Sequence, residues 1–130
     1  MGSWGHKPFE DDDAMDWIAD FETEGLSAIV SAFEAIPSDP SEYVEVREAS
    51  MAIAAGAVLA VSATNSLEDL PESVQAAMNT PLQFDETLRS SAVNALHRVL
   101  MDSELSELWR ETEFFDAWHS QVQSIIDRLQ

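Results

Sequence analysis

The sequence predicts an all-α protein, a small single-domain bundle of about five to seven helices around a central alanine-rich helix. Apolar residues recur at helical spacing, and no segment alternates between apolar and polar residues over five or more positions, as a half-buried strand would. Residues 49–63 (ASMAIAAGAVLAVSA) are apolar on every side, which is typical of a buried helix. A chain of 130 residues, 45% of them hydrophobic, is long enough to form one domain with one core.

Residues 1–10 (MGSWGHKPFE) are expected to form an irregular segment packed on the bundle, because two glycines and Pro8 interrupt any periodic element. The segment carries Trp4 and Phe9, two large apolar side chains that we expect to hold it across the bundle. We interpret these aromatic residues as sealing the open end of the bundle, and the alternative is that they anchor a partner protein.

Two helices are predicted next, over residues 12–22 and 25–36. Aspartates gather in the first turn of the first helix, where they offset the positive end of the helix dipole. The apolar residues of this helix fall on one face: Ala14, Trp17, Ile18 and Phe21. The second helix continues an apolar stripe, but the phase of the stripe slips at Gly25, so we expect a bend there.

A long helix over residues 40–64 is predicted to form the centre of the bundle. Asp39 fits the N-cap position, Pro40 the first helical position and Glu42 the capping-box position. The first half of this helix is charged and its second half is the buried stretch. Gly56 lies in the middle, where glycine costs about 1 kcal/mol relative to alanine, so we expect close packing against another backbone there.

The C-terminal half of the chain predicts three more helices. Thr80 fits the first position of a capping box and Pro81 the first helical position, which predicts a helix over residues 81–101. A polar break then separates helices over residues 103–111 and 113–129, in which leucine, tryptophan and isoleucine residues recur at helical spacing.

The strongest compositional signal is charge, because 25 acidic residues against six basic ones give a net charge of −19. Two zones are especially acidic: residues 1–24 hold eight acids and residues 102–116 hold six. Such a field repels nucleic acid and anionic membranes and attracts cations and basic proteins. An acidic surface that only maintains solubility is the simpler interpretation.

We expect the protein to be cytoplasmic. It has no cysteine, and its first residues lack the basic and then apolar pattern of a secretory signal. The ungapped apolar run from residue 51 to 63 is shorter than the roughly 20 residues that span a bilayer, which favours a buried core helix.

The opening of the chain, MGSWGHKPFEDDDAMDW, resembles the N-terminal motif of a bacterial family known as domain of unknown function 4259. The likeness continues in an alanine-rich central helix that follows Glu48, and in a later pattern, S-E-L-x-x-L-W. The matching positions outside the central helix are Gly2, Trp4, Gly5, Pro8, Phe9, Asp12, Asp13, Ala14, Asp16, Trp17, Ser103, Glu104, Leu105, Leu108 and Trp109.

This resemblance covers nearly the whole chain and implies a small helical domain. It implies no activity, because the family has none assigned. The chain departs from the family at Asp11, where the family usually has Asn, so a hydrogen bond that needs an amide donor at this position is lost.

The turn from Asp12 to Asp16 (DDAMD) is the first candidate for chemistry. On a helix, Asp12 or Asp13 lies one turn from Asp16, and two carboxylates on one face can hold Mg²⁺. Terpenoid-forming enzymes hold a diphosphate with such a motif, but on a far larger helical fold. We prefer a structural interpretation, in which the turn offsets the helix dipole and Asp13 or Asp16 pairs with an arginine.

Glu48 and His97 complete the set of possible metal ligands. Glu45 and Glu48 form an ExxE pair like that of all-α nucleotide pyrophosphohydrolases, but the nearest partner segment, residues 69–72, has the wrong order and contains proline. His97 would join Asp16 or Glu48 in a metal site, although a single histidine beside an apolar face is more often a hydrogen-bonded boundary residue. The candidate set, whether functional or structural, is Trp4, Phe9, Asp12, Asp13, Asp16, Trp17 and Glu48.

Other catalytic signals are absent from the sequence, which has no Gly-x-Ser-x-Gly elbow, no cysteine and no glycine-rich phosphate loop. We therefore predict a non-enzymatic protein-interaction module without a cofactor, which binds a basic protein or associates with itself. The alternative is a metal-dependent hydrolase or small-ligand-binding bundle that uses helix-borne carboxylates and a divalent cation. Convergence of the acidic turn with Glu48 around a concave surface would favour this alternative, whereas pairing with arginines or helix caps would indicate a structural motif.

Overall fold

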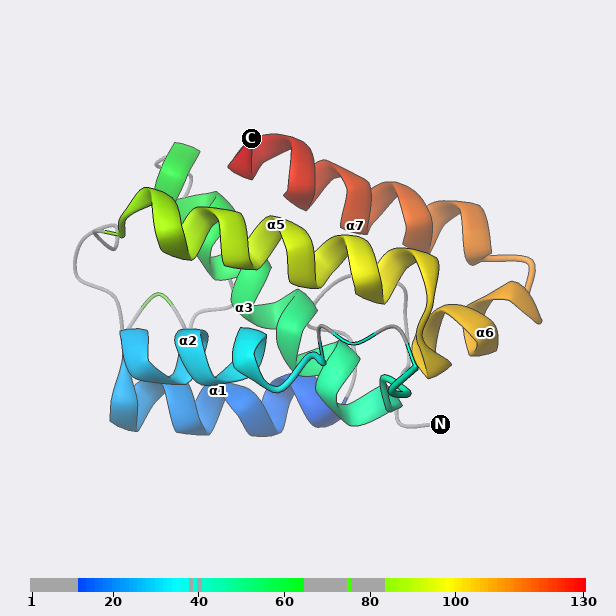
Figure 1. Ribbon diagram of the computed structural model, residues 1–130, viewed down its shortest axis with the longest axis horizontal. Coiled ribbons are helices and arrows are strands. Elements are labelled where there is room, and N and C mark those ends of the chain that lie inside the picture. Colours follow the sequence, from blue (N-terminus) through cyan, green and yellow to red (C-terminus); the bar gives the residue numbers. More distant parts are fainter. Residues whose placement is uncertain (1–11, 38, 40, 65–74, 76–83) are drawn as a thin grey trace.

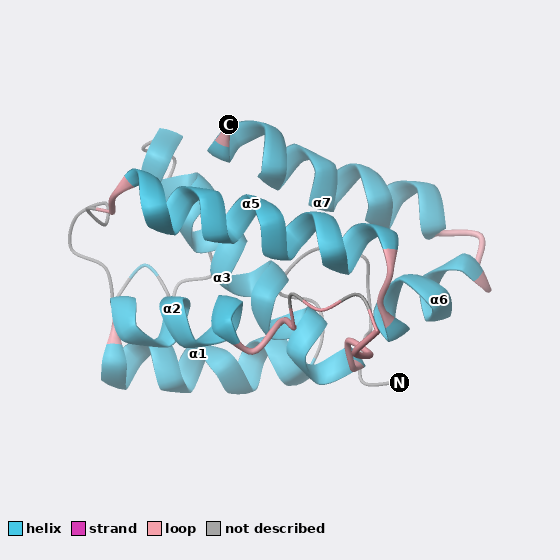
Figure 2. Ribbon diagram, in the orientation of Figure 1, coloured by secondary structure: helices cyan, strands magenta, loops and turns pink. Residues whose placement is uncertain are grey.

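A computed structural model describes residues 12–37, 39, 41–64, 75 and 84–130, and the predicted all-α architecture is confirmed (Figure 2). The described residues contain helices and loops and no strand. The helices are α1 (Asp12–Glu24), α2 (Leu26–Glu34), α3 (Val46–Thr64), α5 (Glu86–Met101), α6 (Glu104–Arg110) and α7 (Phe115–Leu129). The expected positions of Trp4 and Phe9 lie outside the described residues.

Helix α3 passes through the middle of the bundle (Figure 1). The α1–α2 pair packs on one side of it and the α5–α7 pair on the other, while α6 lies at one end. Helix α3 contacts each of the other five described helices, so the prediction of a central alanine-rich helix is confirmed.

Small residues let the neighbouring helices approach α3 closely. From Ala52 to Val61 only Gly56 interrupts a continuous set of buried apolar side chains. A Cβ atom at Gly56 would lie 2.7 Å from Leu96 Cδ1 and 3.3 Å from Ile125 Cγ2. Gly56 therefore lies where side chains of α5 and α7 press against the central helix. Close packing at Gly56 is confirmed, but the expectation that another backbone makes this contact is wrong, because the nearest atoms belong to the side chains of Leu96 and Ile125.

By length and composition, α3 resembles a membrane span. It has 19 residues, and the window from Val46 to Ala63 is long and apolar enough to cross a bilayer. The helix extends beyond the ungapped apolar stretch of residues 51–63, so the length of that stretch does not exclude a membrane span. Within the fold, however, 72% of this window is buried, as in the core helix of a bundle.

Helices α1 and α2 form a hairpin with a sharp corner at Gly25, whose φ of 62° favours glycine. Inside the hairpin, the indole nitrogen of Trp17 donates a 3.2 Å hydrogen bond to the carbonyl oxygen of Ala28. The Trp17 ring also stacks on Phe21, with ring centroids 5.4 Å apart. The expected bend at Gly25 is confirmed.

The predicted helix over residues 40–64 begins only at Val46, so the prediction for residues 41–45 is wrong. Asp39 does not cap a helix: its Oδ1 atom accepts hydrogen bonds from the backbone N–H and the hydroxyl of Ser41, at 2.9 and 2.8 Å. Two hydrogen bonds with Glu104, far along the chain, hold the start of α3: the Glu104 backbone N–H donates to the Val44 carbonyl oxygen, and the Glu104 side chain accepts from Val46 N. Tertiary contacts thus override a plausible local capping signal.

Helix α5 also starts later than predicted, because Asp85 rather than Thr80 caps it and the helix begins at Glu86. The Asp85 side chain accepts a 2.9 Å hydrogen bond from Leu88 N. Thr80 lies outside the described residues. The polar break after α5 is confirmed: Ser103 caps α6 through a 3.1 Å bond from Ser106 N to its Oγ.

Candidate functional site

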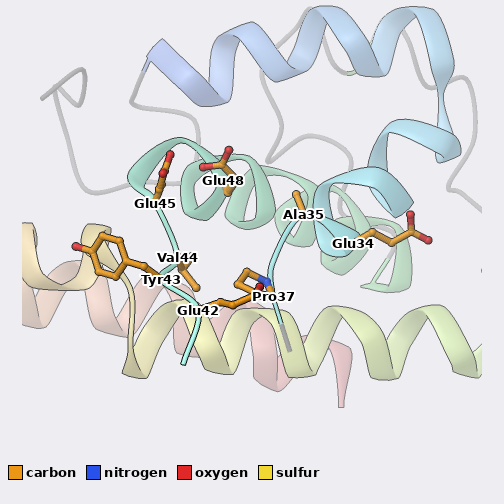
Figure 3. A pocket seen from close by; sticks show the side chains of 8 residues that line it. All are labelled: Glu34, Ala35, Pro37, Glu42, Tyr43, Val44, Glu45 and Glu48. Atoms are coloured by element: carbon orange, nitrogen blue, oxygen red, sulfur yellow. The ribbon is translucent and has the colours of Figure 1, made fainter. Parts of the chain in front are cut away.

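A pocket of about 340 Å³ opens between the end of α2 and the start of α3 (Figure 3). Glu45 and Glu48 project side by side at the start of α3, and Glu34 lies at the other edge, on the last turn of α2 (Figure 3). The residues lining the pocket are Glu34, Ala35, Pro37, Glu42, Tyr43, Val44, Glu45 and Glu48. The pocket therefore combines four carboxylates with one aromatic ring, and none of the described residues that line it is basic.

Arg98 of α5 fixes the wall of the pocket that contains Pro37 and Glu42. Its Nη1 donates hydrogen bonds of 3.0 and 3.1 Å to the carbonyl oxygens of Pro37 and Asp39, and its Nη2 donates to that of Glu42. The Arg98 Nε atom lies 3.6 Å from an Asp102 carboxylate oxygen. One guanidinium thus uses its rigid fork of donors to hold a non-helical segment in place.

Within this wall, Asp39 has a lowered pKa. The main cause is the hydrogen bond from the backbone N–H of Ser41, followed by the bond from the Ser41 hydroxyl. Both bonds favour the charged carboxylate, so the turn that begins the wall is stable when Asp39 is ionised.

Glu104 of α6 holds the segment between α2 and α3 at the end next to α3, through Val44 and Val46. Its backbone N–H donates to the Val44 carbonyl oxygen at 2.9 Å, and its side-chain Oε1 accepts from Val46 N at 2.9 Å. Helix N-termini have unpaired N–H groups, and Glu104 supplies one acceptor from a distant element. These two contacts give Glu104, the glutamate of the S-E-L pattern, a structural role.

Tyr43 connects the pocket to α6. Its hydroxyl donates a 2.9 Å hydrogen bond to Glu107 Oε2, while its side chain stays 55% exposed. This bond, helped by desolvation and by the nearby negative charges, raises the pKa of Tyr43 to about 12. The bond holds the ring at the pocket's edge.

Tyr43 is the only tyrosine in the chain, so tyrosinate absorbance reports its titration directly. We expect a midpoint near 12, and we expect Glu107→Gln to return it towards the ordinary value of 10.0. Because the folded pKa is raised, the Tyr43–Glu107 bond stabilises the fold fully below pH 10 and is lost as the pH rises through about 12. A spectrophotometric titration of both proteins measures this, and identical midpoints would contradict the assigned bond.

Glu48 differs from the other carboxylates of the pocket because it is partly buried. Its Oε2 atom is shielded from solvent and has no hydrogen-bond partner among the described residues. A shielded carboxylate oxygen without a hydrogen-bond donor is costly, so a positive group close to the Glu48 carboxylate would be favoured.

The predicted acidic turn lies at the start of α1. Asp12 and Asp16 are exposed, and Asp13 lies 3.7 Å from Arg47 Nη1, which belongs to the first turn of α3. The Asp13–Arg47 pair is of the kind expected from a structural motif. The side chain of Arg47 is 56% exposed, so the pair adds little to stability.

The remaining candidates are scattered over the fold. Trp17 is a core residue, 1% exposed, and His97 lies on the exposed face of α5. Over the described ranges, no group of three or more Asp, Glu and His side chains is arranged to hold a metal ion. The structure therefore does not bring the predicted metal ligands together within the part of the chain that it describes.

The sequence patterns did not indicate most of the pocket: of its lining residues, only Glu48 was in the candidate set, with Glu45 noted as its ExxE partner. Glu34 is the last residue of α2, and Glu42 and Tyr43 lie in a segment that was predicted to be helical. Arg98 and Glu104, which hold this segment in place, belong to α5 and α6. No spacing along the chain signals such a site. The hydrogen bonds that build its walls join residues 56 to 64 positions apart.

Comparison with protein families assigns the chain. A model of the family described as domain of unknown function (DUF4259) matches residues 2–121, which confirms the resemblance inferred from the motifs. Comparisons with curated proteins and with solved structures found no match. Because the family match covers almost the whole chain, the protein belongs to the DUF4259 family.

Proposed function

We propose that this protein is a non-enzymatic interaction module whose acidic surface binds a basic protein. The observation that carries the proposal is the imbalance of available charge. Each of the five arginines already interacts within the chain, so none is a free countercharge for the surface acids. Their partners, where defined, are Asp13 for Arg47, Glu86 and Phe84 for Arg89, Asp102 and three backbone carbonyls for Arg98, and Phe115 for Arg110; Arg128 also interacts.

Most described carboxylates are exposed, and many fall into the two acidic zones. One set lies on α1, and the other extends from the end of α5 through α6 to the start of α7. The exposed members are Asp12, Asp16, Asp20, Glu22 and Glu24 in the first set, and Asp102, Glu107, Glu111, Glu113 and Asp116 in the second. A field of one sign steers an oppositely charged partner and accelerates its association.

A basic partner is favoured over self-association. Two copies with a net charge of −19 each repel one another, particularly at low salt. The large hydrophobic side chains that the described surface exposes are few: Met15, Tyr43, Met101 and Phe114. The enzymatic alternative has no comparable support, because its predicted ligands do not assemble among the described residues.

The test is affinity capture from the native lysate with the full chain as bait, at low and at high salt. A helical protein of similar net charge and unrelated sequence serves as the matched control. We expect a basic protein to be retained at low salt by this chain and not by the control, and to be released as salt screens the interaction. Capture of no basic protein at low salt, or equal capture by the control, would contradict the proposal.

A further inference from the structure

We infer that the pocket between α2 and α3 binds an arginine side chain of the basic partner. This inference rests on the proposed function and names the part of the acidic surface that gives specificity. It starts from a defined concavity of about 340 Å³ rather than from acidic residues alone. Charge, a buried oxygen and geometry each point to the same ligand.

Among the described residues, the charges that line the pocket are all negative. Glu34, Glu42, Glu45 and Glu48 contribute carboxylates, and no described lysine, arginine or histidine lines the pocket. Helix α2 ends at this pocket with no basic residue in its last turn, so the negative end of its dipole also lacks compensation. The carboxylates and the negative end of the α2 dipole would both favour a cation in the pocket.

Glu48 provides the independent observation. The oxygen Oε2 is shielded from water and lacks a hydrogen-bond donor within the described structure, although the side chain lines the pocket. The two neighbouring arginines do not meet this need. Arg47 lies beside Asp13, and Arg98 donates to backbone carbonyls. A donor that carries positive charge would stabilise the ionised form of Glu48.

The spacing of the carboxylates favours a guanidinium over a metal ion. Over the described residues, no three acidic or histidine side chains converge enough to hold one ion. A guanidinium is wider, offers five donors in one plane and can reach separated carboxylates such as Glu45 and Glu48. The same group stacks on aromatic faces, and the half-exposed Tyr43 ring lies at the edge of the pocket.

The probe is a short peptide with one arginine between neutral residues, and the control peptide carries citrulline in its place, which keeps the shape and removes the charge. Titration into the full chain is followed by backbone amide resonances and by calorimetry at about 0.15 M salt, where long-range attraction is screened. We expect the arginine peptide to shift the amide resonances of residues 34–36 and 42–48. We expect the citrulline peptide to bind at least roughly fivefold more weakly.

Two double variants with the same change in net charge separate the pocket from the general field. Glu45→Gln with Glu48→Gln removes two pocket carboxylates, and Glu111→Gln with Glu113→Gln removes two exposed carboxylates beyond α6. We expect the pocket variant to weaken the arginine peptide roughly fivefold or more, and the distant variant less than about twofold. Glu45→Gln alone is the second pocket variant, because Glu45 is exposed and its loss leaves the core intact.

Each alternative result has a defined meaning. Equal weakening by the two double variants overturns the pocket while leaving the basic-partner proposal in place. Stronger shifts of the amide resonances of residues 34–36 and 42–48 by calcium or magnesium chloride than by the arginine peptide overturn the choice of ligand. Binding of the arginine peptide in the pocket, combined with capture of no basic protein from lysate, supports the pocket and contradicts the proposed function.

Discussion

Trp17→Ala is expected to destabilise the fold by about 3–5 kcal/mol, the range for loss of a buried tryptophan side chain. Trp17 is 1% exposed, stacks on Phe21 and donates a hydrogen bond to the Ala28 carbonyl oxygen. The substitution removes all three contributions and leaves a cavity within the α1–α2 hairpin. Against a total stability of about 5–15 kcal/mol for a typical domain, this loss is a large fraction.

Urea denaturation followed by circular dichroism measures this change, and two further variants separate its causes. Trp17→Phe keeps an aromatic ring but removes the indole donor, and we expect a loss of about 1–2 kcal/mol. Phe114→Ala is the matched control, since this aromatic side chain is 52% exposed and its truncation should cost under about 1 kcal/mol. A similar loss for Trp17→Ala and Phe114→Ala would contradict the assigned role of Trp17.

Arg98→Met is expected to destabilise the fold by about 2 kcal/mol and to release the pocket wall. The methionine keeps most of the apolar stem of the side chain but removes the donors to the Pro37, Asp39 and Glu42 carbonyl oxygens. A hydrogen bond from a charged donor contributes about 1.5–3 kcal/mol. Because water can bond to the exposed carbonyl oxygens once the guanidinium is gone, the expected loss of stability is smaller than the sum of three such bonds.

The measurement combines urea denaturation with hydrogen exchange of the amides in residues 41–45. Arg47→Met is the matched control, because Arg47 is 56% exposed and lies 3.7 Å from its one defined partner, Asp13. We expect the control to change stability by less than about 0.5 kcal/mol. If Arg98→Met left both stability and exchange as in the unmodified chain, Arg98 would not be the residue that holds the wall.

Local patterns were sufficient to predict much of the architecture. The apolar stripe of α1, the corner at Gly25 and the break before α6 all depend on interactions within a few residues, such as the bond between Ser103 Oγ and Ser106 N. The continuous apolar stretch that ends in Ala63 predicted a helix buried on all sides, and α3 contacts every other described helix. Hydrophobic patterning and local turn and cap residues carry this information.

The same local rules failed where distant residues compete for the backbone. Asp39 has the right type and position for an N-cap, yet its side chain bonds Ser41 without a helix following. Arg98 binds the carbonyl oxygens of Asp39 and Glu42, which the predicted helix would use. Capping signals describe what a segment can do, and tertiary hydrogen bonds select among the options. The predicted start at residue 40 was therefore wrong, although the rest of the helix was predicted correctly.

By itself, the sequence determined an acidic all-α bundle around a buried central helix, and its motifs indicated the family. Those properties depend on composition, periodicity and a contiguous N-terminal pattern, all of which can be observed along the chain. The tertiary structure alone decided where α3 begins and where the acidic pocket lies. Glu104 and Arg98 act on residues 56 to 61 positions away, and only the packing of α5 and α6 against the segment between α2 and α3 brings them there.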